Sequence, residues 1–366
     1  MIYGSLFQCI DPALTIAASM SARSPFVSPF DRRDEADAAR KEFAIGGSDH
    51  LTTLNAFNAW KETRRTKGER EVQTFLQESF LSRLTLFQME DLRRQLSDLL
   101  VDVGFLPKDF RLKGGKRRKG RKLDEPEALR SAADAYSDNM PLIKAILCAG
   151  LYPNIIVAPR SLVRKDGGVG DKEVGECAFQ SLKGEVYLHP CTILFSEKWL
   201  DSRYCCYHDI MRTTKTYVRD CTTVSELALL LFGGSLKVYH MHGVVTVDDW
   251  LMFRISPKAA ALVKHLRAQM ESMLLKKIVS PKEDITGSDT AKGLIQAVSA
   301  LFAQEISTLP GLTGADIVRQ WKGTQNNERQ ITGRWRNGGG RGSSASRGGR
   351  DSQERSGRGR GRGSSQ

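Results

Sequence analysis

Residues 142–159, LIKAILCAGLYPNIIVAP, most limit what this chain can fold into, because two kinds of secondary structure meet there. Apolar residues in the first half recur at helical spacing, whereas Gly150 and Pro153 favour the end of a helix. The β-branched run 154–158 that follows is typical of a strand. Helical patterns precede this joint and strand patterns follow it, so we predict an α+β protein with several domains.

The first predicted domain is an all-α bundle over residues 1–137. Asp11 and Pro12 are suited to the start of a helix, and Asp138 to capping the helix that enters the joint. Apolar residues at helical spacing predict further helices after residue 31 and over 49–65, and then two helices over 73–101 that end near Gly104. Leu92, Leu96, Leu99 and Leu100 are expected on the buried side of the last one.

The second predicted domain, residues 138–256, is a small β-barrel. Candidate strands lie at 154–158, 176–182, 185–189, 204–208, 216–220, 236–247 and 250–255, with a capped helix at 225–232. Residues 257–332 are expected to form C-terminal helices, over 257–278 and 290–307, and a linker that ends in a helical turn over 315–321. Residues 333–366 are rich in Gly, Ser and Arg and cannot build a core, so we predict a disordered tail.

The net charge of +13 is concentrated in two short segments. Residues 113–122 carry seven positive charges and no acid, and residues 334–366 carry a net +7, so the remaining chain is nearly neutral. Flexible basic arms suit a polyanion such as RNA. The candidate RNA contacts in these arms are Lys116, Arg117, Arg118, Lys119, Arg341, Arg358, Arg360 and Arg362. The first arm could instead be a nuclear localisation signal, and the tail a solubilising or methylated segment.

The chain has no apolar run near the roughly 20 residues that span a bilayer, so no membrane partner is expected. Its first residues lack the basic start of a signal peptide. The seven cysteines are odd in number and form no CxxC pair. We therefore expect reduced thiols and a location in the nucleus, the cytoplasm or both.

Two motifs suggest other chemistry and have simpler interpretations. His189, Cys191, Cys205, Cys206 and His208 supply possible zinc ligands, but alternate strand residues face opposite ways, so buried thiols are favoured and no metal is expected. Residues 34–37 spell DEAD, the Mg²⁺-binding string of some helicases, but lie among Arg, Lys and Ala. We interpret them as a solvated helix face, and assign no catalytic residue.

The segment RTTKTYVRD, residues 212–220, is the best candidate for RNA contact within the barrel. Lys215, Tyr217 and Arg219 alternate, so a strand would place two cations and an aromatic ring on one face, with Arg212 nearby. Phosphate pairing and base stacking are how such barrels hold single strands. The alternative is a polar outer face with Arg219 paired to a carboxylate. Arg164 and Lys165 are weaker candidates.

Several phrases, in this order, resemble the C-terminal half of DEAH/DExH-box RNA helicases. They are SLFQCIDPALTIAASMSARSPF, FLSRLTLFQMEDLRRQL, AILCAGLYPNII, VYLHPCTILF, TTKTYVRDCTTVSELALLLFGG and VDDWLMFRISPKAAALVKHLRAQM. The resemblance covers about residues 3–280 and implies the end of a winged helix, a helicase-associated helical bundle, and an oligonucleotide-binding (OB-fold) barrel. It implies an RNA-binding accessory role, with single-stranded or structured RNA as the partner.

The same resemblance implies an ATP-dependent motor of two RecA-like domains, whose motifs are absent from these residues. Gly114-Gly115-Lys116-Arg117 lacks the spacing of a phosphate-binding loop. We expect no cofactor here, with ATP and Mg²⁺ bound by a RecA-like core in cis or in trans, and activating proteins as possible partners. The alternative is a free-standing RNA-binding adaptor with an OB-fold and an RGG-like tail.

Overall fold

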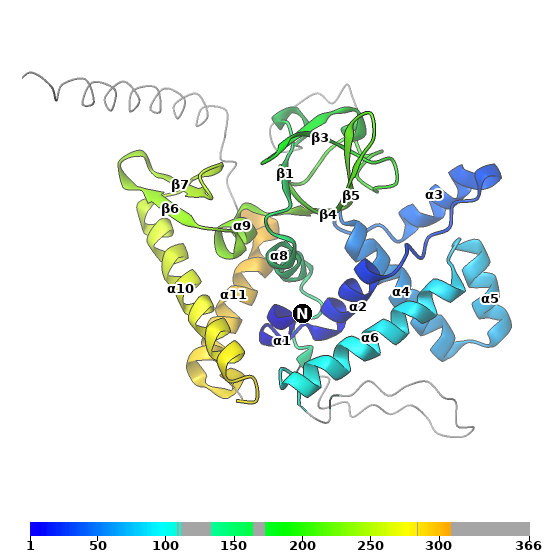
Figure 1. Ribbon diagram of the computed structural model, residues 1–366, viewed down its shortest axis with the longest axis horizontal. Coiled ribbons are helices and arrows are strands. Elements are labelled where there is room, and N and C mark those ends of the chain that lie inside the picture. The colour runs from blue at the N-terminus through cyan, green and yellow to red at the C-terminus, as the bar shows by residue number, and fades with distance from the viewer. Residues whose placement is uncertain (108–109, 111–132, 164–172, 284, 309–366) are drawn as a thin grey trace, which may run out of the picture. The chain divides into compact units, whose positions relative to one another are not determined.

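The computed structural model describes residues 1–107, 110, 133–163, 173–283 and 285–308 (Figure 1). Several predictions lie outside these residues: the basic segment 113–122 with Lys116, Arg117, Arg118 and Lys119, the loop cations Arg164 and Lys165, the turn at 315–321, and the tail with Arg341, Arg358, Arg360 and Arg362. They stay predictions.

The N-terminal part is helical, as predicted. It comprises α1 (Ile2–Leu6), α2 (Ile10–Ser21), the 3₁₀ turn η1 (Phe30–Arg32), α3 (Arg33–Glu42), α4 (Asp49–Thr66), α5 (Glu69–Glu78) and α6 (Arg83–Val103). Ser48 and Ser82 cap α4 and α6 by accepting hydrogen bonds from backbone N–H groups of the first turn. Phe57 and Trp60 of α4 are fully buried and pack against Leu86 of α6.

Three details of the helices differ from expectation. Helix α2 begins at Ile10, so Asp11 lies in its first turn and pairs with the buried Arg93 of α6. Asn139, not Asp138, caps α8 (Met140–Leu151), because its side-chain oxygen accepts from the N–H of Leu142 at 3.2 Å. Leu99 is 58% exposed, since the buried face of α6 is one position away, at Leu100 and Val101.

After α8 the chain forms the predicted barrel from five strands. These are β1 (Ile155–Val157), β2 (Ala178–Ser181), β3 (Gly184–Leu188), β4 (Tyr204–Arg212) and β5 (Thr216–Val224). They close in the order β1-β2-β3-β5-β4, in which β3 and β5 are parallel and every other pair is antiparallel. Phe179, Val186, Leu188 and Val218 fill its interior.

The strands after the barrel form a separate sheet, so the barrel predicted over 138–256 is too long. The single strand expected over 236–247 is two strands, β6 (Leu236–Tyr239) and β7 (Val244–Val247), and β8 (Leu251–Arg254) pairs with β7. The 3₁₀ turn His240–His242 and Gly243, at a φ of +59°, reverse the chain between them. The sequence predicted one strand because apolar residues alternate on both sides of this turn.

Helices connect and follow the two sheets. Helix α9 (Glu226–Phe232) is capped by Ser225, α10 (Pro257–Val279) by Ser256, and α11 (Asp289–Thr308) packs against α8. The guanidinium of Arg267 on α10 donates to the backbone carbonyls of Leu230, Gly233 and Gly234. It therefore satisfies the C-terminal carbonyls of α9 and ties α10 to it.

Candidate nucleic-acid interface

Two tyrosines stand side by side on the outer face of the barrel. Tyr187 of β3 and Tyr217 of β5 are direct partners in the parallel ladder, and their ring centres are 6.4 Å apart. Their neighbours Leu188 and Val218 point into the core, so both tyrosines face outward and are partly exposed. The His189 ring extends the row, with its centre 6.1 Å from that of Tyr217 and edge-on to it.

A cation lies over one end of this aromatic row. The ammonium nitrogen of Lys215 is 4.1 Å from the centre of the Tyr187 ring, and the side chain is exposed. Such a contact stabilises the cation by about 0.5–1 kcal/mol at an exposed site. Tyr187, Tyr217, His189 and Lys215, which we call the aromatic face, thus offer ring surfaces for bases beside a charge for phosphate.

His189 is held in one tautomer. Its Nδ1 accepts from the backbone N–H of Cys191 at 3.1 Å, so in the neutral ring the proton is on Nε2. Partial burial, and next the nearby Arg219 cation, lower the pKa of His189 below its usual value. The aromatic face therefore carries a neutral hydrogen-bond donor at this end.

Arg219 lies on the same face as Tyr217 but is less available than predicted. A hydrogen bond with the side chain of Cys191 and the carboxylates of Asp220 and Asp209 raise its pKa. Asp209 also lies directly opposite Arg219 in the β4–β5 ladder. Arg212 is exposed but pairs with Thr216, one position from Tyr217, so strand alternation places it on the other face. The structure thus brings together Lys215, Tyr217 and Arg219, and separates Arg212.

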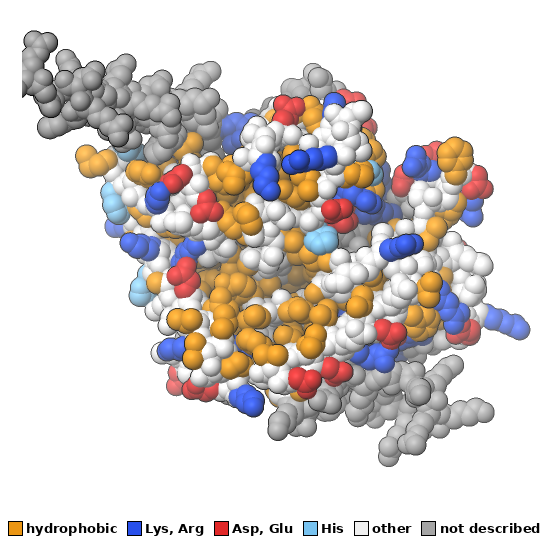
Figure 2. All heavy atoms as spheres, viewed as in Figure 1, with side chains coloured by type: hydrophobic (Ala, Val, Ile, Leu, Met, Phe, Trp, Pro, Cys, Tyr) orange, Lys and Arg blue, Asp and Glu red, His pale blue; other side chains and the backbone are white. Residues whose placement is uncertain are grey.

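Sequence reasoning missed Tyr187 as a member of this face and considered His189 only as a metal ligand. The alternation of Glu185, Tyr187 and His189 indicates that these three residues share one face of a strand. Residue spacing does not reveal that β3 pairs with β5, because the two strands are not consecutive in the chain. Tyr187 also donates to the Glu185 carboxylate, so one edge of the face is acidic. Figure 2 shows Lys, Arg, Asp and Glu side chains interspersed on the surface it draws.

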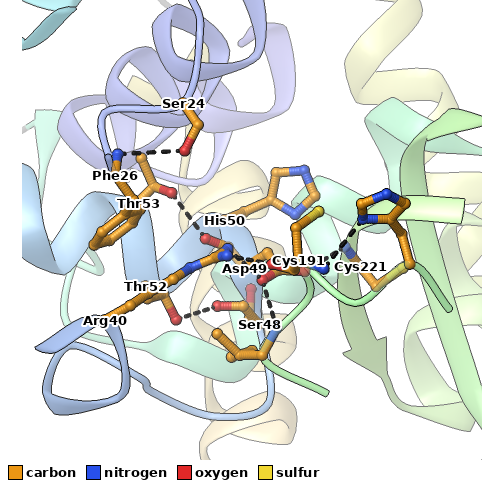
Figure 3. Close-up of polar contacts among 12 residues, drawn as sticks. Ser24, Phe26, Arg40, Ser48, Asp49, His50, Thr52, Thr53, Cys191 and Cys221 are labelled. Atoms are coloured by element: carbon orange, nitrogen blue, oxygen red, sulfur yellow. Dashed lines mark hydrogen bonds and ion pairs between the residues drawn. The ribbon is translucent and has the colours of Figure 1, made fainter. Parts of the chain in front are cut away.

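A second polar cluster joins the bundle to the barrel (Figure 3). Asp49, the first residue of α4, is 2% exposed and accepts three hydrogen bonds. Its donors are the Arg40 guanidinium at 2.9 Å, the Ile193 N–H at 3.0 Å and the Cys221 N–H at 2.9 Å. Burial raises the pKa of Asp49 to about 6, and these donors oppose that rise. A carboxylate of the bundle therefore organises two backbone segments of the barrel.

His50 and Ser48 complete this junction through one threonine. The Thr222 hydroxyl lies 2.8 Å from Nδ1 of His50 and 2.6 Å from the hydroxyl of Ser48. Burial, together with the nearby His208, lowers the pKa of His50 to about 3. Its ring is therefore neutral at physiological pH and serves to hold β5 on the bundle.

The other motifs have structural roles in the described part of the chain. In the DEAD string, Asp34, Glu35 and Asp37 are exposed on α3 and Ala36 is buried, which is the predicted helix face. Cys205 lies in the barrel core, and Cys206 lies in the core cluster that includes Cys148 of α8. Among the described residues, no three His, Cys, Asp or Glu side chains cluster as metal ligands, and no helix is long and apolar enough to cross a membrane.

Comparison with known protein families finds three matches along the chain. Residues 1–53 match the helicase associated domain (HA2), ratchet-like; residues 143–236 match the oligonucleotide/oligosaccharide-binding (OB)-fold; and residues 243–304 match the C-terminal domain in RNA helicases. The OB-fold match spans α8 and the closed barrel. The third match takes in most of the separate sheet and the helices after it.

Individual relatives agree with these matches. The chain is 35% identical over 307 residues to the DExH-box ATP-dependent RNA helicase DExH1 of Arabidopsis thaliana, covering 83% of this chain and 27% of the relative. It is 35% identical over 316 residues to the putative ATP-dependent RNA helicase DHX57 of Mus musculus, covering 83% and 23%. It is 34% identical over 305 residues to the ATP-dependent DNA/RNA helicase DHX36 of Homo sapiens, covering 82% and 28%. The chain spans about a quarter of their length.

Proposed function

Because this chain belongs to the DExH/DEAH-box RNA helicases through their C-terminal domain set, we propose that it is an RNA-binding accessory module of such an enzyme. In this proposal the barrel holds single-stranded RNA on its aromatic face. A RecA-like core, in cis or in trans, binds ATP and Mg²⁺ and moves the strand. Activating proteins are further partners of the assembled enzyme.

The observation that carries this proposal is the row Tyr187–Tyr217–His189 with Lys215 over its end. Bases stack on aromatic rings without regard to sequence, which suits a protein that must hold any part of a moving strand. A duplex hides its base faces, so the same rings favour unpaired RNA. The carboxylates of Glu185 and Asp209 lie beside Tyr187 and Arg219, which supports holding by stacking more than by charge.

The test is to compare binding of a fluorescently labelled single-stranded oligoribonucleotide and its duplex to the whole chain, and to assay RNA-stimulated ATP hydrolysis in parallel. We expect the single strand to bind more tightly and no ATP turnover, because the 366 residues contain no phosphate-binding loop. Equal affinity for duplex, unaffected by substitutions on the aromatic face, would contradict the proposal. ATP turnover that survives repurification would show a motor in these residues.

A further inference from the structure

The loop of residues 189–193 links the aromatic face to the bundle. At its start the His189 ring contacts Tyr217, and in its middle the side chain of Cys191 lies near enough to Arg219 to affect its pKa. On its other side the carbonyl of Cys191 accepts from Arg40, and the N–H of Ile193 donates to Asp49. One short loop therefore touches the candidate RNA contacts on one side and the helical bundle on the other.

Arg40 is the bundle residue that fixes this loop. One guanidinium nitrogen donates to the Cys191 carbonyl and the other to the Asp49 carboxylate, and the guanidinium carbon lies 5.0 Å from the centre of the Phe26 ring. The side chain is only 16% exposed. A guanidinium is planar and rigid, so it can donate to the Cys191 carbonyl and to the Asp49 carboxylate in a fixed geometry. An ammonium group has no such plane to fix the two acceptors.

We propose that Arg40 is a positioning residue for RNA binding: from α3 it sets the place of the 189–193 loop, and so of His189 and Arg219, without itself contacting RNA. This inference rests on the proposed function of the aromatic face. Without Arg40 the Cys191 carbonyl loses its donor and the buried Asp49 loses its countercharge, so the loop relaxes. In this proposal the helical bundle, through Arg40, contributes to RNA affinity although every residue of the aromatic face belongs to the barrel.

The first test measures affinity of the full chain for a labelled oligouridine of about 12 nucleotides, within the usual site size of such barrels. Arg40→Ala should weaken binding about three- to thirtyfold, the range typical of residues that act through a coupled network. Arg40→Lys should restore part of the loss. The matched control is Arg64→Ala, because Arg64 also pairs with a carboxylate, Glu90, and lies over an aromatic ring, but within the bundle. It should leave affinity unchanged.

A double-mutant cycle separates the possible failures. If Arg40 acts by positioning His189 and Arg219, its effect should largely vanish in a background that carries His189→Ala and Arg219→Ala. Should Tyr217→Ala and Lys215→Ala weaken binding while Arg40→Ala does not, the inference is wrong and the proposed function stands. If none of the three changes affinity, the proposed function itself is wrong. Equal losses in Arg40→Ala and Arg64→Ala would assign the effect to general loss of stability and overturn the inference.

Hydrogen exchange provides a readout that a merely structural role would not change. The N–H groups of Ile193 and Cys221 both donate to Asp49, so their exchange reports on the junction. RNA should slow their exchange in the parent protein, and this RNA-dependent slowing should be lost in Arg40→Ala. If the variant speeds exchange by the same factor with and without RNA, Arg40 only stabilises the fold and the inference fails.

Discussion

The ammonium nitrogen of Lys215, in the turn that precedes β5, lies 4.1 Å from the centre of the Tyr187 ring on the neighbouring strand β3. The cation thus covers a ring surface on which a base could stack, and lies close enough to pair with the phosphate of the same nucleotide. Binding a nucleotide here exchanges a cation–ring contact for a cation–phosphate contact beside a stacked base. Little rearrangement of the barrel is needed.

Replacing Tyr217 with alanine removes the central ring of the row. We expect affinity for single-stranded RNA to fall by roughly 1–3 kcal/mol, the usual contribution of one stacking platform. Tyr217→Phe should keep most of the affinity, because the ring and not the hydroxyl provides the stacking surface. Fluorescence anisotropy checks both, with Tyr239→Ala on the separate sheet as the control. A phenylalanine variant as weak as the alanine variant would argue against stacking.

Lys215→Ala should remove a contact with an RNA phosphate and should therefore make RNA affinity less dependent on salt concentration. Each phosphate neutralised on a single strand contributes a slope of about −0.7 to the logarithmic dependence of affinity on salt, and we expect one such contribution to be lost. Binding titrations at several salt concentrations measure it. Lys258→Ala, an exposed cation on α10, is the control. If both variants shift the slope equally, Lys215 makes only a diffuse electrostatic contribution.

Deleting residues 334–366 tests the predicted basic tail. Nine arginines spaced by glycine and serine should add phosphate contacts, so the deletion should weaken RNA binding and flatten its salt dependence. Deleting residues 113–122 tests the other basic segment by the same titration. Unchanged binding together with lost nuclear import would assign that segment to localisation.

His50 should make the fold sensitive to acid. Its pKa is about 3 in the folded protein, below the ordinary value of 6.5, so between these values only the unfolded chain takes up the proton. Its contribution to stability is therefore complete above pH 6.5 and is lost as the pH falls, by about 2 kcal/mol at pH 5. Asp49, whose pKa is raised, acts in the opposite direction between about pH 4 and 6.

The comparison is therefore between the parent and His50→Asn, because the contribution of Asp49 is common to both. Chemical unfolding at pH 5 and pH 7 should show a smaller pH difference in the variant, in which the amide can still bond to Thr222. An unchanged difference would mean that His50 does not cause the acid sensitivity.

Two glycines should respond to alanine in opposite ways. A Cβ atom on Gly234 would collide with the Asp248 carboxylate, which accepts from the Ser235 N–H at 2.6 Å, so Gly234→Ala should destabilise the fold by about 1–3 kcal/mol. Gly293 lies exposed in α11 with open space around it, and Gly293→Ala should stabilise by about 0.5–1 kcal/mol. Thermal unfolding of both variants measures these changes in stability. If both variants were stabilised, or both destabilised, the packing described here would be contradicted.

Local patterns predicted the helices, the five barrel strands and the outward position of Tyr217, because period and capping residues are local properties. They did not predict how strands pair. Tyr187 joins Tyr217 only through the parallel β3–β5 contact, and β6 pairs with β7 in a separate sheet instead of joining the barrel. Both facts depend on contacts between distant residues.

The junction was harder still to foresee. Asp49 has the sequence signature of an ordinary first-turn acid, and nothing near it reveals that its donors come from Ile193 and Cys221. Likewise, the sequence left open whether Arg219 contacts RNA or pairs with a carboxylate, because its neighbours Cys191 and Asp209 come from other segments of the barrel. Burial and pairing of charges follow from tertiary packing, which residue spacing does not encode.

The Asp49–Cys221 bond also orders events during synthesis. The donor is made 172 residues after the acceptor, an interval of roughly ten to thirty seconds at ordinary translation rates of about 5–20 residues per second. Until then the Asp49 carboxylate can bond to Arg40, and later to Ile193, but lacks its third donor from β5. The bundle thus reaches its final form only when β5 has been made, and a nascent chain that stalls before residue 221 presents an open, hydrated junction to the cell.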